Sequence, residues 1–374
     1  MKKVLLFILL PLLSMAQSKI GGDIDGEAAG DENGWSVSLS SNGTTLAIGA
    51  PSNDGNGNFA GSVRVYKKVS GTWIKVGGDI DGEADNDFSG ASVSLSSDGS
   101  IVAIGAPGFA GTGSGSVRVY KNVTGTWTKV GADIDGEAAG DYSGASVSLS
   151  SDGTTVAIGA ELNAGSGNLA GSVRVYKNVS GTWTKVGADI DGEADGDVSG
   201  GSVSLSSDGT IVAIGAYYND GSGTNAGSVR VYKNESGTWT KIGADIDGEA
   251  PDDNSGNSVS LSSDGTTVAI GASFNDGNGT YAGSVRVYDL AAVLSSDSFV
   301  LANFSMYPNP ATEVVTITLQ ENLQLEKVNI YNTLGQLVKT EKNSSINVSS
   351  LSKGSYYFEV ITNQGKATKT VLVQ

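Results

Sequence analysis

Apolar and polar residues alternate along most of this chain. Val93 and Leu95, for example, are separated by serines and precede a Ser-Asp-Gly turn, a pattern that predicts a β-hairpin. The next segment, residues 101–106, is apolar or small at every position, as is typical of a strand covered on both faces. Two more alternating segments follow at residues 117–120 and 126–131. Four short antiparallel strands are therefore expected in this stretch.

The same stretch occurs five times. The phrase Asp-Ile-Asp-Gly-Glu-Ala begins at residues 23, 79, 133, 189 and 245, with spacings of 56, 54, 56 and 56. Each copy continues through Ser-Val-Ser-Leu-Ser-Ser, Ala-Ile-Gly-Ala, a Gly/Asn-rich loop and Gly-Ser-Val-Arg-Val-Tyr. No segment has helical spacing. Repeated four-stranded units are typical of β-propeller blades, so we expect an all-β, five-bladed β-propeller.

The ends of the repeat array predict a closed ring. The fifth unit stops at Asp289 and lacks the Thr-Trp-x-Lys-x-Gly strand, whereas residues 19–23 align with residues 75–79. An N-terminal strand in that position would complete the last blade and cover both exposed edges. We expect the propeller to occupy residues 17–289 and to be closed by this strand.

Residues 1–16 form a predicted secretory signal peptide. Lys2 and Lys3 precede an apolar run over residues 4–13 and a Ser-Met-Ala cleavage pattern. The apolar run is too short to span a membrane, and no other stretch approaches twenty apolar residues. The chain has no Cys, which excludes a lipoprotein anchor and disulfides. We expect an exported chain with no transmembrane span after processing.

Composition excludes several classes of function. The formal net charge of -17 becomes more negative when the two lysines of residues 1–16 are removed, and such a surface repels nucleic acids. The absence of His and Cys excludes histidine-based catalysis, thiol nucleophiles and ordinary zinc sites. Near-identical blades also give no asymmetric cluster of an acid and a base. We therefore expect a protein that is not an enzyme.

The strongest candidate site is the acidic phrase itself, which carries four carboxylates within nine residues. Oxygen ligands at this density, with a glycine that permits a tight bend, suit calcium, the one cofactor we consider. The alternative is that these acids cap turns and pair with the repeated arginines. The candidate calcium ligands are Asp23, Asp25, Glu27, Asp31, Asp79, Asp81, Glu83, Asp87, Asp133, Asp135, Glu137, Asp141, Asp189, Asp191, Glu193, Asp197, Asp245, Asp247, Glu249 and Asp253.

Two further features are repeated in the units. The Gly/Asn-rich loops, such as residues 53–58 and 275–279, suit contact with a glycan or peptide, or are plain long turns. The repeated tryptophans are expected to pack rather than to form a sugar platform. Few positions break the symmetry of the blades, and Trp35, Glu161 and Tyr217 are among them.

The units resemble the FG-GAP repeat of integrin-α-type propellers. Phe88-Ser89-Gly90 and Gly105-Ala106-Pro107 stand where that family has its two name motifs. The proline is kept only at Pro51 and Pro107, and the calcium loop of the family has shrunk here to turns such as residues 97–99. Most propellers of that type have seven blades, so the count of five comes from this sequence.

The chain changes character after the repeats. A linker is expected over residues 290–302, and residues 303–374 form a separate β domain with a Tyr-Pro-Asn-Pro opening, an Asn-Thr-Leu-Gly-Gln-Leu-Val turn and a Lys-Gly-Ser-Tyr-Tyr strand. This segment resembles the C-terminal sorting domain of type IX secretion cargo. The resemblance implies a small β-sandwich that docks on the outer-membrane translocon of a Gram-negative bacterium, with the cargo released or held on the cell surface.

Together these features indicate a secreted or surface-exposed binding and adhesion module, with a glycan or surface protein as its ligand. Near-identical blades favour weak multivalent binding, because repeated sites add avidity. A ligand-free extracellular spacer is the main alternative, and a carboxylate-dependent glycosidase is a further one.

Overall fold

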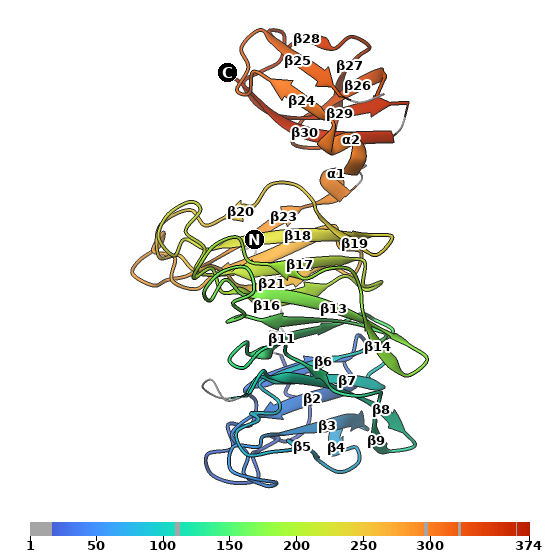
Figure 1. Cartoon of the computed structure of the whole chain (residues 1–374), viewed down its shortest axis with the longest axis vertical. Helices are drawn as coiled ribbons and strands as arrows, with labels where there is room; N and C mark the ends of the chain where they lie inside the picture. Colours follow the sequence, from blue (N-terminus) through green and yellow to red (C-terminus); the bar gives the residue numbers. More distant parts are fainter. Residues whose placement is uncertain (1–16, 109–112, 295–297, 321–322, 364) are drawn as a thin grey trace, which may run out of the picture.

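The computed structural model describes residues 17–108, 113–294, 298–320, 323–363 and 365–374. The predicted signal peptide, residues 1–16, lies outside this part of the chain. The described residues form five similar antiparallel sheets and then two sheets of a C-terminal domain. Figure 1 shows the five sheets stacked from the first, at the lower end, to the fifth, next to the C-terminal domain. The predicted all-β class is confirmed.

Each repeated sheet contains three strands in chain order. The first strand carries the alternating serines: β1 (Ser36–Leu39), β6 (Ser92–Leu95), β11 (Ser143–Leu149), β16 (Ser199–Leu205) and β21 (Ser255–Leu261). The second is the Ala-Ile-Gly-Ala strand: β2 (Thr45–Ala50), β7 (Ile101–Ala106), β12 (Thr155–Ala160), β17 (Ile211–Ala216) and β22 (Thr267–Ala272). The third carries the repeated arginine: β3 (Ser62–Val69), β8 (Ser116–Val123), β13 (Ser172–Val179), β18 (Ser228–Glu235) and β23 (Ser284–Asp289).

The outer edge of the first four sheets holds two short strands in place of one. The tryptophan strand pairs with the end of the third strand: β4 (Thr72–Lys75), β9 (Thr126–Lys129), β14 (Thr182–Lys185) and β19 (Thr238–Lys241). The Ile-Asp of the acidic phrase pairs with its beginning: β5 (Ile80–Asp81), β10 (Ile134–Asp135), β15 (Ile190–Asp191) and β20 (Ile246–Asp247). Between β4 and β5, Gly77 has a φ of 77°, a left-handed conformation that lets the chain bend there.

The structure corrects the predicted closure of the ring. The fifth sheet has only β21, β22 and β23, and among the described residues no segment from the N-terminus pairs with β23. The residues expected to close it lie instead at the first sheet, where a Cβ on Gly21 would meet Trp73 Cδ1 at 3.4 Å. Figure 1 shows the reason, because the first and fifth sheets lie at opposite ends of an open stack.

Consecutive sheets are joined by a buried interface that recurs along the stack. Between the first two sheets, Val63 and Val65 of β3 pack against Val93 and Leu95 of β6. Equivalent apolar clusters join the second to the third sheet, the third to the fourth and the fourth to the fifth. Trp127 Nε1 adds a 2.8 Å hydrogen bond to the carbonyl oxygen of Val76 in the preceding unit. The repeated tryptophans are therefore packing residues, as expected.

The C-terminal domain is a small β-sandwich, as its resemblance implied. The short helices α1 (Ala291–Leu294) and α2 (Ser298–Ala302) lead into it from the fifth sheet. One sheet contains β24 (Phe304–Tyr307), β25 (Val314–Leu319) and β28 (Ser345–Asn347). The other contains β26 (Leu325–Tyr331), β27 (Leu337–Glu341), β29 (Gly354–Thr362) and β30 (Gly365–Val373). Phe304, Ile330 and Phe358 are among the residues of the core between them.

Candidate functional site

The acidic phrase is the connection between consecutive sheets. In its second copy, Ile80 and Asp81 form β5 on the outer edge of the first sheet, where Asp81 lies opposite Ser62. Glu83 and Asp87 then follow in the segment that leads to β6 of the second sheet. The four acids are thus distributed along a connector. Asp81 belongs to the first sheet, whereas Glu83 and Asp87 precede the first strand of the second sheet.

The last acid of each phrase caps a turn. Asp87 Oδ2 accepts hydrogen bonds from the backbone N–H groups of Glu83 and Ala84, both at 2.9 Å. The carboxylate of Asp141 does the same and also accepts a 3.0 Å bond from Asn163 Nδ2. The same cap is formed in the other copies by Asp31, Asp197 and Asp253. Backbone donors that are otherwise unpaired thus occupy these oxygens.

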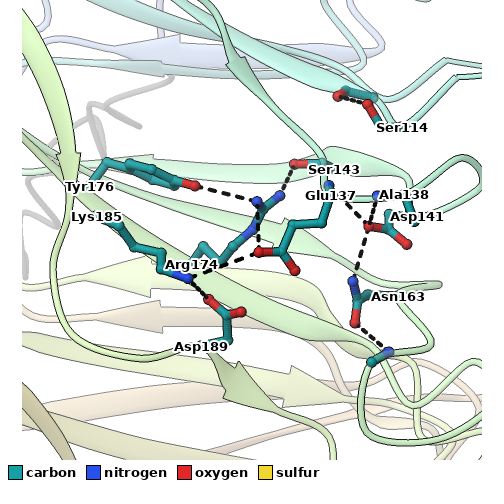
Figure 2. Close-up of polar contacts among 12 residues, drawn as sticks. Ser114, Glu137, Ala138, Asp141, Ser143, Asn163, Arg174, Tyr176, Lys185 and Asp189 are labelled. Carbon is teal, nitrogen blue, oxygen red and sulfur yellow. Dashed lines mark hydrogen bonds and ion pairs between the residues drawn. The ribbon is translucent and has the colours of Figure 1, made fainter.

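The glutamate of the first four phrases pairs with two cations. Glu83 Oε1 lies 3.3 Å from Arg118 Nη1 and 3.1 Å from Lys129 Nζ, and Lys129 also reaches Asp133 at 2.7 Å. Figure 2 shows the equivalent group in the third sheet, where Arg174 and Lys185 both approach Glu137. The same Arg–Glu–Lys–Asp chain occurs with Arg64, Glu27, Lys75 and Asp79, and with Arg230, Glu193, Lys241 and Asp245.

Ion pairs, hydrogen bonds and burial shift the pKa values of side chains in the acidic phrase and of its lysine partner. The hydrogen bond from Lys129 holds the pKa of Glu83 below its ordinary value, and the bond to Asp133 raises the pKa of Lys129. Burial raises the pKa of Asp81, and the charge of Asp79 adds to the effect. The described residues contain no group of three or more acids placed to hold a metal ion. The structure gives these acids the capping and pairing roles that were the alternative to calcium binding.

A pair of side chains in the third and fourth sheets breaks the repeat symmetry. Tyr217 Oη donates a 3.3 Å hydrogen bond to Glu161 Oε2. Burial raises the pKa of Glu161 against this hydrogen bond, and burial also raises the pKa of Tyr217. The Tyr218 ring lies 4.6 Å from that of Tyr217. Burial thus favours the protonated form of both side chains.

The Gly/Asn-rich loops lie on one edge of the stack, which we call the loop edge: residues 51–61, 161–171, 217–227 and 273–283. It is the left edge in Figure 1, opposite the hairpins that join β8 to β9 and β13 to β14. The first asparagine of these loops is buried, and Asn163 Oδ1 accepts a 2.9 Å bond from the Gly165 N–H. These amides build the turn and are not free for a ligand.

Large apolar side chains are exposed on the loop edge. Phe59 stacks on Phe88, with ring centroids 5.6 Å apart and planes 6° from parallel. Phe274 and Tyr281 meet edge to face at 5.4 Å. Phe59, Leu169, Tyr218, Phe274 and Tyr281 all remain exposed. Sequence reasoning missed this row, because it concentrated on the polar residues of the loops. The available signal was the apolar residue before Ala-Gly-Ser in the first, third and fifth units, which is Phe59, Leu169 or Tyr281.

Comparison with known families agrees with both resemblances. Residues 24–66 and 241–288 match the model of the FG-GAP repeat, and residues 305–374 match that of the secretion system C-terminal sorting domain. The chain thus carries FG-GAP repeats and a type IX sorting domain, which marks it for secretion or for the outer surface of a Gram-negative bacterium. No helix in the described part of the chain is long and apolar enough to cross a membrane.

One curated relative is an ulvan lyase from Nonlabens ulvanivorans, 39% identical over 88 residues. The match covers 22% of this chain and only 16% of that protein. A solved structure with a related arrangement is the periplasmic gluconolactonase of Pseudomonas aeruginosa, with a TM-score of 0.45, 15% identity and coverage of 91% of this chain and 88% of that one.

Another solved structure is the β-propeller domain of the Trilobed protease from Pyrococcus furiosus. Its TM-score is 0.40 at 11% identity, with coverage of 90% of this chain and 94% of that one. Similarities this low carry no argument about activity.

Proposed function

Because the chain joins FG-GAP repeats to a secretion sorting domain, we propose that it is a non-enzymatic binding and adhesion module of the bacterial exterior. The loop edge is its binding surface. The ligand class that fits this surface is a glycan, since exposed aromatic rings in the loops of the first, fourth and fifth sheets offer flat apolar faces for sugar rings.

The observation that carries this proposal is that the repeated polar side chains are bonded within the protein, whereas apolar side chains of the loop edge are exposed. The repeated acids, arginines and loop asparagines are engaged with one another or with the backbone. Apolar side chains are left exposed in the same loops, such as Phe59, Leu169 and Tyr218. A row of weak sites on one rigid support gains affinity for a polymer through avidity.

The test is binding of the chain from residue 17 onward to immobilised polysaccharides and matrix proteins. Ulvan belongs in the panel, because one relative is an ulvan lyase. Replacing Phe59, Leu169 and Tyr218 together with alanine is expected to weaken binding at least about tenfold, since three contacts of a multivalent site are lost. The readout is the apparent Kd from surface binding.

A matched control replaces Val69, Val123 and Val179 with alanine. These residues are also exposed, but they lie at the hairpins on the opposite edge, and binding should be unchanged. Equal losses in both triple variants would place the ligand elsewhere. Failure of the unaltered chain to bind any member of the panel would favour the spacer function, and cleavage of a polysaccharide would refute the non-enzymatic proposal.

A further inference from the structure

Every internal sheet uses two different faces. We call the face toward the preceding sheet its incoming face and the face toward the following sheet its outgoing face. Val93 and Leu95 belong to the incoming face of the second sheet, and Val63 and Val65 to the outgoing face of the first. Because the units are nearly identical, the same two surfaces meet at each of the four interfaces in the chain.

The two ends of the stack each leave one such face uncovered. On the incoming face of the first sheet, Val37 and Leu39 are 62% and 58% exposed, whereas their counterparts Val93 and Leu95 are 9% and 8% exposed. On the outgoing face of the fifth sheet, Val285 and Val287 are 70% and 63% exposed. Their counterparts in the first sheet, Val63 and Val65, are almost fully buried.

In the described ranges, the hydrogen bonds that join consecutive sheets are also missing on the two uncovered faces at the ends of the stack. Ser92 Oγ donates to the carbonyl oxygen of Gly144 in the next sheet at 2.8 Å. The backbone N–H of Leu95 donates to Ser38 Oγ of the preceding sheet at 2.9 Å. The end counterparts are Ser258 on the outgoing face and Leu39 on the incoming face, and within the described residues neither makes the equivalent inter-sheet bond.

Among the residues that the structure describes, the fifth sheet lacks its two outer strands, and the chain carries a copy of one of them, the Ile-Asp strand, that is not used as a strand. Residues 19–25 have the sequence pattern of residues 75–81, which include β5 in the first sheet. In that sheet Ile80 lies opposite Val63 in an antiparallel pair. Residues 19–25 are in no strand, and the edge of β23 that would receive Ile24 is unpaired in the fifth sheet. An added strand is a common way to bind such an edge.

A hollow on the outgoing face fits the one tryptophan that breaks the repeat. The hollow has a volume of 510 Å³ and is lined by Gly271, Ser273 and Val285, among others. Trp35 stands where the fourth sheet has Gly201, and a Cβ there would lie 3.2 Å from Glu161 of the preceding sheet. Ser273 is the equivalent of Glu161 in the fifth unit. Trp35 of another copy would thus enter this hollow.

We propose that the chain associates head to tail with further copies of itself, the first sheet of one copy packing on the fifth sheet of the next. The argument is continuity, because the new interface would repeat one that the chain already forms four times. Residues 19–25 of one copy would add the missing Ile-Asp strand to the fifth sheet of its neighbour. An interface of two different surfaces can propagate, so it yields filaments or closed rings of several copies.

A second copy fits this interface better than the chain's own N-terminal segment. The first and fifth sheets lie at opposite ends of the stack in Figure 1, so closure within one chain would require the whole array to bend. The C-terminal domain follows the fifth sheet but leaves Val285 and Val287 exposed, so it does not cover the outgoing face.

The test uses sedimentation velocity of the chain from residue 17 onward over a concentration series. The unaltered chain is expected to grow in mass with concentration, with a blue shift of Trp35 fluorescence measured against a Trp35→Phe variant. One variant, Val37→Asp with Leu39→Asp, blocks the incoming face. Another, Val285→Asp with Val287→Asp, blocks the outgoing face. Each should stay monomeric, and circular dichroism should show normal folding because these side chains are exposed.

Mixing the two variants gives the decisive result. Each retains one intact face, so the mixture should form complexes of twice the monomer mass and grow no further. The control Val123→Asp with Val179→Asp, on exposed hairpin positions, should assemble like the unaltered chain. A monomeric unaltered chain at all concentrations would overturn the proposal. Assembly that survives either blocking variant, or a mixture that stays monomeric, would overturn it too.

Discussion

Replacing Gly105 with alanine is expected to destabilise the repeat array by about 3 kcal/mol, because the new methyl group would be forced into the next sheet. Gly105 lies in β7, and a Cβ there would overlap the carbonyl oxygen of Gly144, which belongs to the rigid backbone of the third sheet. The same close approach occurs between Gly49 and Gly90 and between Gly159 and Gly200. The measurement is the midpoint of denaturant unfolding followed by circular dichroism.

Gly271 supplies the matched control, since it is the equivalent glycine in the fifth sheet. A Cβ on Gly271 would meet Ser258 Oγ, which can rotate away, and no backbone atom of a following sheet. At concentrations where the chain is monomeric, Gly271→Ala should therefore change stability by less than about 1 kcal/mol. Equal losses for the two variants under those conditions would show that the fifth sheet is covered in the monomer, contrary to the open stack.

Replacing Arg118 with methionine is expected to cost about 3 kcal/mol. The arginine side chain is 2% exposed, and it donates to Asp81 O at 3.2 Å and to Ser89 Oγ at 3.0 Å besides pairing with Glu83. Methionine fills much of the same volume but donates no hydrogen bond, so buried acceptors would be left unpaired. Thermal unfolding and denaturant titration measure the loss.

Arg286→Met is the control for the arginine prediction. Arg286 donates to Asp247 O at 2.7 Å and to Ser255 Oγ at 3.0 Å, as its counterparts do, but it lies on the uncovered fifth sheet where water can replace it. We expect a loss below about 1 kcal/mol for the monomer. A small loss at Arg118, similar to that at Arg286, would contradict the role assigned to the buried arginine.

Much of the fold follows from the sequence because the units repeat. The period fixes the number of sheets, the alternation of Val93 and Leu95 with serines fixes one face of β6, and the glycine turns fix the hairpins. The role of the repeated arginine was also accessible, since a charged residue among core valines needs an acidic partner. The ion pair of Arg118 with Glu83 confirms that prediction.

The sequence did not reveal that the ring stays open. The alignment of residues 19–23 with residues 75–79 identifies a spare strand, but not the sheet edge that receives it. That choice depends on the rotation between consecutive sheets, which is set by many inter-sheet contacts rather than by a local pattern. The strand formed by Ile80 and Asp81 of the acidic phrase was not accessible from the local sequence either. These residues form a strand because the edge of β3 is available to pair with them.

The central claim of this account is that the repeated acids hold the connectors and sheets together, and that recognition belongs to the loop edge. Thermal unfolding of the chain from residue 17 onward, in millimolar calcium and in chelator, tests it most directly. We predict the same melting temperature in both, because the carboxylates of residues such as Asp87 and Glu83 are already occupied. A strong calcium-dependent rise would contradict it, since each saturated site contributes about 2.7 kcal/mol at a hundredfold excess over its Kd.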